Sequence, residues 1–111
     1  MKIYVFDLDG TLCVTNKHMD GYWEYKAAQP FPDRINRVNK LFDSGNKIII
    51  ETARGSNSRE DWTNFTKEQI IGWGLKFHEL RAGTKYAADY YIDDRSINSE
   101  EFFSGRNLHI N

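Results

Sequence analysis

Two carboxylates, Asp7 and Asp9, follow the first apolar run of the chain. That run, residues 3–6, is almost unbroken and predicts a strand buried on both faces. Side chains two positions apart on an extended chain point the same way, so both carboxylates are expected to face one small volume. A hard divalent cation would relieve their repulsion. The alternative is that residues 7–10 are only an ordinary turn that closes the strand, since Asp and Gly are common turn residues.

Two further apolar runs, at residues 47–51 and 90–92, predict strands that also end in polar clusters. Ligands of open α/β sheets bind outside the carboxyl ends of the strands. If the three strands are neighbours, four carboxylates and one hydroxyl converge in an oxygen-rich site suited to magnesium and phosphate. The residues that follow these two strands are Thr52, Ala53, Arg54, Asp93 and Asp94.

Helical patterns separate the predicted strands. Pro32 opens a helix that ends at Gly45. Residues 62–73 predict a second helix, which a capping box of Thr66 and Gln69 could restart. Alternating residues over 75–80 predict a half-exposed strand with His78 facing solvent. The remaining expected elements are a helical turn at residues 83–88 and a short helix at residues 96–103.

Residues 14–31 show no clear period and predict a short flap over the site. The alternative is a surface hairpin that covers core. Its aromatic side chains are too many to lie all on an exposed loop unless they pack on something. These aromatic residues are Tyr22, Trp23, Tyr25 and Phe31.

Strands alternating with helices predict an α/β fold: a single Rossmann-like, three-layer domain over residues 1–111 with a mostly parallel sheet. A chain of 111 residues has no room for a second core. The formal charge of −1 offers no general attraction for nucleic acid or an anionic membrane. The single Cys13 and the lack of an N-terminal apolar segment favour the cytoplasm, with Cys13 as a packing residue.

Four short segments resemble the motifs of the haloacid-dehalogenase-like (HAD) phosphohydrolases, in the same order along the chain. Residues 7–12, Asp-Leu-Asp-Gly-Thr-Leu, resemble the first motif, and Thr52-Ala53-Arg54 the second. Lys85 resembles the third motif and residues 91–94, Tyr-Ile-Asp-Asp, the fourth. The chain has no room for an inserted cap domain, so it looks like the capless branch. Within that branch it is similar to capsule-polysaccharide-biosynthesis phosphatases.

The resemblance implies a hydrolase mechanism through an aspartyl phosphate. Asp7 would be the nucleophile, and Asp9 the acid that protonates the leaving oxygen and then the base that activates water. Lys85 would screen negative charge, and Thr52 would donate its hydroxyl to the phosphoryl group. The amides of Leu8 and Ala53 would do the same. The substrate-contacting residues implied in this way are Leu8, Gly10, Ala53 and Arg54.

The resemblance also implies a Mg²⁺ cofactor. Asp93 is expected to bind the metal directly, with Asp94 nearby or acting through water. Arg54 could bind substrate or neutralise the acidic cluster. The metal-site residues implied are Asp7, Asp9, Asp93 and Asp94.

The expected partner is a small-molecule phosphate ester, such as a sugar phosphate. One alternative is a phosphatase of nucleotides or nucleic-acid ends, and near-neutral charge argues against it. Another is a protein that binds a phosphorylated ligand without turnover, which has no need for the acid Asp9. A phosphoacceptor signalling receiver does not match, because its acidic pair and its acceptor Asp lie on separate strands, whereas Asp7 and Asp9 share one. The sequence does not decide whether the protein forms a homo-oligomer.

Overall fold

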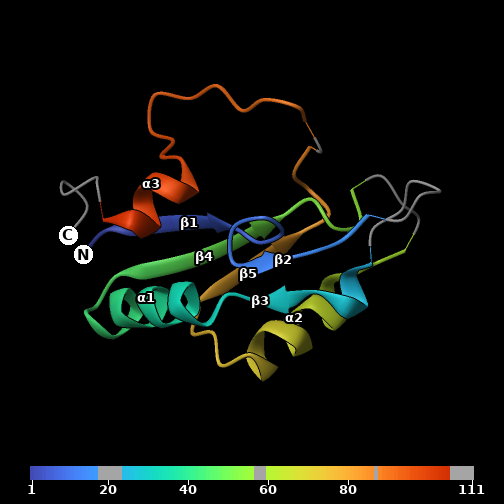
Figure 1. The fold of residues 1–111 in the computed structure, drawn as a ribbon, viewed down its shortest axis with the longest axis horizontal. Helices are drawn as coiled ribbons and strands as arrows, with labels where there is room; N and C mark the ends of the chain where they lie inside the picture. The colour runs from blue at the N-terminus through green and yellow to red at the C-terminus, as the bar shows by residue number, and fades with distance from the viewer. Residues whose placement is uncertain (18–23, 57–59, 87, 106–111) are drawn as a thin grey trace.

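A parallel sheet of three strands forms the centre of the computed structural model, which describes residues 1–17, 24–56, 60–86 and 88–105 (Figure 1). The strand order is β1-β4-β5. The described helices are α1, α2 and α3, and the α/β class and parallel sheet predicted from the sequence are confirmed. The bounds are β1 Ile3–Asp7, β4 Lys47–Thr52, β5 Glu79–Ala82, α1 Pro32–Asp43, α2 Thr63–Gly72 and α3 Ser99–Ser104.

One face of the sheet carries the core. Tyr4 pairs with Ile48 and Phe6 with Ile50, so these side chains share a face. Buried residues from all three helices join the same hydrophobic cluster. Ile3 points to the other face and is 61% exposed. The described residues therefore form two layers, and the predictions of three layers and of a β1 strand buried on both faces are wrong.

The helix α1 begins and ends where the sequence predicts. Pro32 occupies the first turn, where its missing N–H costs nothing. Ile35, Val38 and Leu41 are buried on one stripe of the helix, and each contributes about 1.5–3 kcal/mol by leaving water. Gly45, with φ of 91°, then turns the chain toward β4.

The strand β5 lies four positions beyond the predicted start at residue 75. Leu75 is buried in the core, and the amide of Lys76 donates to Oδ1 of Asn39 at 2.8 Å. The apolar positions of this segment thus pack as a connection before the strand starts at Glu79. His78 is exposed, as predicted, although its Nδ1 accepts a hydrogen bond from the amide of Ile48 at 3.0 Å.

A small antiparallel hairpin follows β1, in the region predicted as a flap. It consists of β2 Cys13–Val14 and β3 Gln29–Pro30, with the 3-10 helix η1 Tyr25–Ala27 before β3. Ala28 is buried, and the amide of Phe31 donates to the carbonyl of Leu12 at 2.9 Å. The base of the predicted flap is therefore anchored on the core, while Tyr22 and Trp23 lie outside the described residues.

The connection from β5 to α3 arches away from the sheet in Figure 1. Its described residues, 83–86 and 88–98, contain no strand or helix, so the predictions of a helical turn there and of a strand at residues 90–92 are wrong. Ile92 is 97% exposed. An apolar run becomes a strand only when a neighbouring edge accepts its hydrogen bonds, and this run meets none here. The final helix α3 is confirmed, and Asn98 caps it by accepting from the amide of Glu100 at 2.9 Å.

Candidate active site

The turn after β1 sets the direction of both acids. Leu8 and Leu12 are fully buried and hold the turn against the core. Gly10 adopts a φ of 85°, which side chains disfavour, and its amide donates to the carbonyl of Cys13 at 2.8 Å. The turn therefore needs glycine at position 10. It presents Asp7 and Asp9, both partly buried, at the carboxyl edge of the sheet.

Asp7 is paired with Lys85. The Nζ of Lys85 lies 3.2 Å from Oδ1 of Asp7, and the hydroxyl of Thr11 donates to Oδ2 at 3.3 Å. The ammonium also lies 4.7 Å from the centre of the Tyr91 ring, a cation–π distance. Lys85 is held in place through its own carbonyl, which accepts from the hydroxyl of Ser56 at 2.5 Å. A partly exposed carboxylate thus lies beside one fixed cation.

Asp9 has a different set of partners. The guanidinium of Arg54 binds it through two hydrogen bonds, Nη2 to Oδ1 at 2.8 Å and Nε to Oδ2 at 2.9 Å. The hydroxyl of Thr15 donates to Oδ1 at 2.5 Å. The side chain of Arg54 is 0% exposed, so removing Asp9 would leave a buried charge and cost about 3–5 kcal/mol.

These surroundings change two pKa values. Burial raises the pKa of Asp9, but the hydrogen bonds and charge of Arg54, with help from Thr15, hold it below its ordinary value. Burial, followed by the negative charge of Asp9, raises the pKa of the Cys13 thiol to about 11. Cys13 is therefore a protonated packing residue, as the sequence predicts.

The end of β4 lies beside the end of β1. Asp7 pairs with Glu51, so Thr52 is the first residue beyond that pair. Thr52 is buried, and its Oγ1 accepts from the amide of Arg54 at 3.2 Å. This bond uses a lone pair of the hydroxyl and does not use its hydrogen. The proposed roles of Leu8, Gly10, Ala53 and Thr52 toward a phosphoryl group stay predictions.

Asp93 and Asp94 are not brought to these acids. Both are exposed in the segment between β5 and α3, and Asp93 accepts from the amide of Arg95 at 2.8 Å. Within the described ranges, no group of three His, Cys, Asp or Glu side chains could hold a metal ion. Both oxygens of Asp9 are already bound to Arg54. In this arrangement the residues do not fit the Mg²⁺ site that the resemblance implies.

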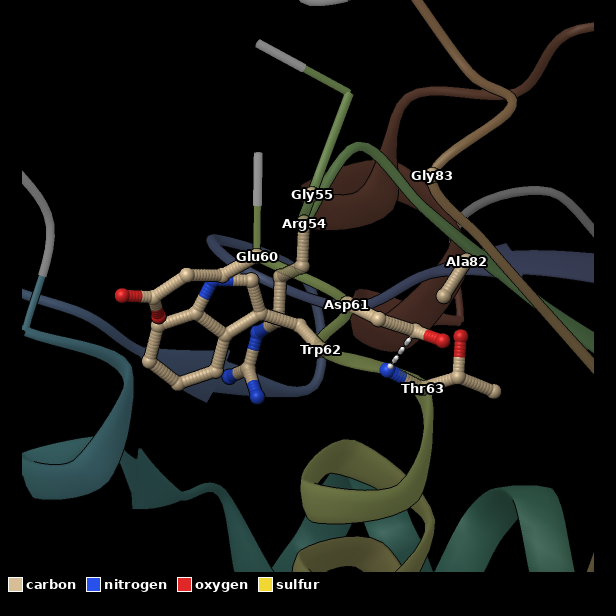
Figure 2. A pocket seen from close by; sticks show the side chains of 8 residues that line it. All are labelled: Arg54, Gly55, Glu60, Asp61, Trp62, Thr63, Ala82 and Gly83. Atoms are coloured by element: carbon tan, nitrogen blue, oxygen red, sulfur yellow. Dashed lines mark hydrogen bonds between the residues drawn. The ribbon is translucent and has the colours of Figure 1, made fainter. Parts of the chain in front are cut away.

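A hollow of about 350 Å³ lies next to the ends of β4 and β5. Figure 2 shows Glu60 and the indole of Trp62 on the left with Arg54 beside them, and the side chain of Asp61 on the right, near Ala82 and Thr63. Asp61 accepts from the amide of Thr63 at 2.9 Å, drawn as a dashed line. The hollow is open and polar, so it could take a hydroxyl-bearing ligand.

Sequence reasoning missed several residues of the site. Thr66 and Gln69 were interpreted as a capping box, but α2 begins at Thr63 and both side chains accept from Nη1 of Arg54, at 3.3 and 2.7 Å. Their spacing of three was the available signal, because it places them on one face of a helix. Thr15 and Trp62 also contribute and have no site role in the sequence analysis, where Tyr25 is only a flap aromatic and Tyr91 only part of the fourth motif.

The chain is similar in fold to a known structure, but the comparison with known proteins assigns it no activity. No protein-family model matches the chain, and no curated protein matches it. A crystal structure of a Vibrio cholerae protein, described only as a structural target, is similar with a TM-score of 0.77 and 27% identity. The match covers 94% of this chain and 89% of that one. Across the part of this chain that the structure describes, no helix is long and apolar enough to cross a membrane.

Proposed function

We propose that this protein is a phosphohydrolase that uses Asp7 as its nucleophile. The observation that carries the proposal is the pairing of Asp7 with Lys85 at 3.2 Å, at the carboxyl edge of a parallel sheet. A second acid on the same turn, Asp9, is held apart by its own cation. The resemblance of four segments to the HAD phosphohydrolases supports the assignment and favours a small phosphate ester as substrate.

The proposed reaction has two displacements. An oxygen of Asp7 attacks phosphorus, and the bond from phosphorus to the leaving oxygen breaks. That oxygen takes a proton from the protonated form of Asp9, which is the minor form because Arg54 favours the carboxylate. Asp9, now a carboxylate, takes a proton from water, which attacks the aspartyl phosphate and releases phosphate and Asp7. Lys85 lies beside the attacking carboxylate and offsets the negative charge gathered there. The carboxylate form of Asp9, which Arg54 favours, suits the second displacement.

The resemblance to the HAD phosphohydrolases also implies that this reaction uses Mg²⁺. The described residues do not assemble its ligands, and the two displacements above use only side chains of this protein. Asp93 and Asp94 would have to move to the ends of β1 and β4 before a metal could be held. Their proposed role depends on a rearrangement of residues 88–98.

The adjacent hollow supports a hydroxyl-rich substrate. Carboxylates such as Glu60 and Asp61 accept hydrogen bonds from sugar hydroxyls, and the ring of Trp62 offers an apolar face. Its acidic lining disfavours a polyanion such as a nucleic-acid strand. We therefore propose a sugar phosphate or a similar small metabolite.

The wider assignments are proposals of the same kind. A Rossmann-like fold is supported by the parallel strand order and by the similarity to the Vibrio cholerae structure. A single domain without a cap is proposed from the resemblance to the capless HAD phosphohydrolases. A cytoplasmic location is supported by the buried, unpaired Cys13.

Turnover of phosphate esters tests the proposal. Purified protein, with and without Mg²⁺, is incubated with an aryl phosphate, sugar phosphates and nucleotides. We expect Asp7→Asn to lower turnover by about three orders of magnitude. Asp43→Asn is the matched control, because Asp43 forms a surface ion pair with Lys76 at 2.8 Å and should keep wild-type turnover. Equal activity of the wild type and Asp7→Asn would refute the proposal and favour phosphate binding without turnover.

A further inference from the structure

The side chain of Arg54 points into the protein and is shielded from solvent. Its guanidinium has five N–H groups. Four of them are used inside the protein, on Asp9, Thr66 and Gln69. The side chain is 0% exposed. Although Arg54 lines the hollow in Figure 2, its guanidinium has one N–H left, on Nη2, and its side chain offers no exposed surface to a phosphate.

The carboxylate of Asp9 is fixed by the same contacts. Two parallel hydrogen bonds from Arg54 prevent rotation about the bond to the carboxyl group. Thr15 donates to Oδ1 from the hairpin side, at 2.5 Å. The thiol of Cys13 also lies 3.5 Å from Oδ1. Asp9 is therefore held from β4 and from the β2 side at once.

Arg54 also contacts the base of the hairpin. Its guanidinium carbon lies 4.6 Å from the centre of the Tyr25 ring, a cation–π distance. Gln69, which accepts from Arg54, donates through Nε2 to the carbonyl of Tyr25 at 2.8 Å. The ring of Tyr25 in turn meets Trp62, with centres 4.9 Å apart. Arg54 thus links the acid Asp9, the helix α2 and the segment that leads into the hairpin.

We propose that Arg54 is a positioning residue, which acts on Asp9 and on the η1 segment and does not bind the phosphate of the substrate. This inference rests on the proposed function. It replaces the expectation that Arg54 contacts substrate. Displacing a group that takes part in proton transfer by about 1 Å can lower turnover about 100-fold without changing substrate affinity. Loss of Arg54 should therefore change kcat and spare KM.

Kinetics of Arg54→Lys test the proposal, because lysine keeps the charge but loses the two parallel hydrogen bonds. We expect kcat to fall about 10- to 100-fold while KM changes less than about threefold. Added guanidinium at millimolar concentration should restore part of kcat in Arg54→Ala, where it fills the vacated site. Arg81→Lys is the control, since Arg81 is exposed on β5 and should keep both constants.

A direct phosphate contact predicts the opposite pattern. In that case KM, and the dissociation constant of inorganic phosphate, would rise at least tenfold in Arg54→Lys, and this result would overturn the proposal. If the lysine variant does not fold, Thr66→Val with Gln69→Met removes the acceptors of Nη1 and keeps Arg54. That double variant should lower kcat with KM unchanged, and an unaltered kcat would overturn the proposal.

Failure of the proposed function gives a different result. A wild-type protein without turnover would refute the phosphohydrolase. The affinity of Arg54→Lys for inorganic phosphate would then decide the role of Arg54 alone. Unchanged affinity supports positioning, and a tenfold loss overturns it.

Discussion

Asp7 and Lys85 lie 78 positions apart in the sequence, yet the Nζ of Lys85 is 3.2 Å from Oδ1 of Asp7. The pair joins the end of β1 to the connection that follows β5, across the full width of the described sheet. An ion pair that is partly exposed contributes about 0–1 kcal/mol to stability. Its position at the proposed nucleophile therefore matters more for chemistry than for folding.

Replacing Lys85 is expected to separate activity from stability. Lys85→Ala should lower kcat by about 100-fold, because it removes the cation beside the attacking carboxylate. The free energy of unfolding should fall by about 1 kcal/mol or less. Steady-state kinetics and urea denaturation measure the two effects. Lys76→Ala, which breaks a surface pair with Asp43, should leave kcat unchanged. Full activity in Lys85→Ala would mean that another cation offsets the negative charge at Asp7 and the phosphoryl group.

The pair of Asp9 with Arg54 predicts a loss of stability in acid. The pKa of Asp9 is lower in the folded protein than its ordinary value of 3.8. The carboxylate therefore stabilises the fold above pH 3.8, and this contribution is lost as pH falls through the folded pKa. Urea denaturation from pH 7 to pH 3 should show a steeper loss for the wild type than for Asp9→Asn. Parallel losses in the two proteins would show that other carboxylates cause the acid sensitivity.

Magnesium is expected to alter the segment that carries Asp93. If Asp93 joins Asp7 on a metal, residues 88–98 must leave their exposed path, and the edge strands of the described sheet, β1 and β5, could pair with them. Amides at residues 90–92 should then exchange more slowly with deuterium when Mg²⁺ is added. Asp93→Asn should abolish that protection, and Asp89→Asn should retain it. If the exchange rates of these amides do not change when Mg²⁺ is added, this segment supplies no ligand.

Trp23 tests whether the hairpin region covers the site. It lies outside the described residues, two positions before Tyr25, whose ring packs on Arg54. A covering role predicts that Trp23→Ala lowers activity, or changes the oligomer in sedimentation, with little change in melting temperature. Trp62→Ala is the comparison. It should lower stability by about 1–3 kcal/mol, because its ring contacts Tyr25 and Phe65. If Trp23→Ala melts early and keeps its activity per folded molecule, the residue belongs to the core.

Several features were determined by the sequence alone. The helix from Pro32 and the strands β1 and β4 were predicted because each has a complete local signal: a start residue, one apolar period and a glycine or polar stop. The turn with Asp7, Asp9 and Gly10 was predictable for the same reason. These residues also carry the resemblance to the phosphohydrolases.

Tertiary structure decided the rest. The apolar run at residues 90–92 is locally as strand-like as residues 47–51, but only the second lies between two neighbours that accept its hydrogen bonds. Thr66 and Gln69 match a capping box, yet they bind Arg54 because α2 starts earlier and turns them toward β4. The sequence shows which residues carry a charge, but it does not show which of them pair. The parallel order β1-β4-β5 decides that Asp9 receives a buried arginine and Asp7 a lysine that is 18% exposed, since these cations follow β4 and β5, far from the acids in the chain.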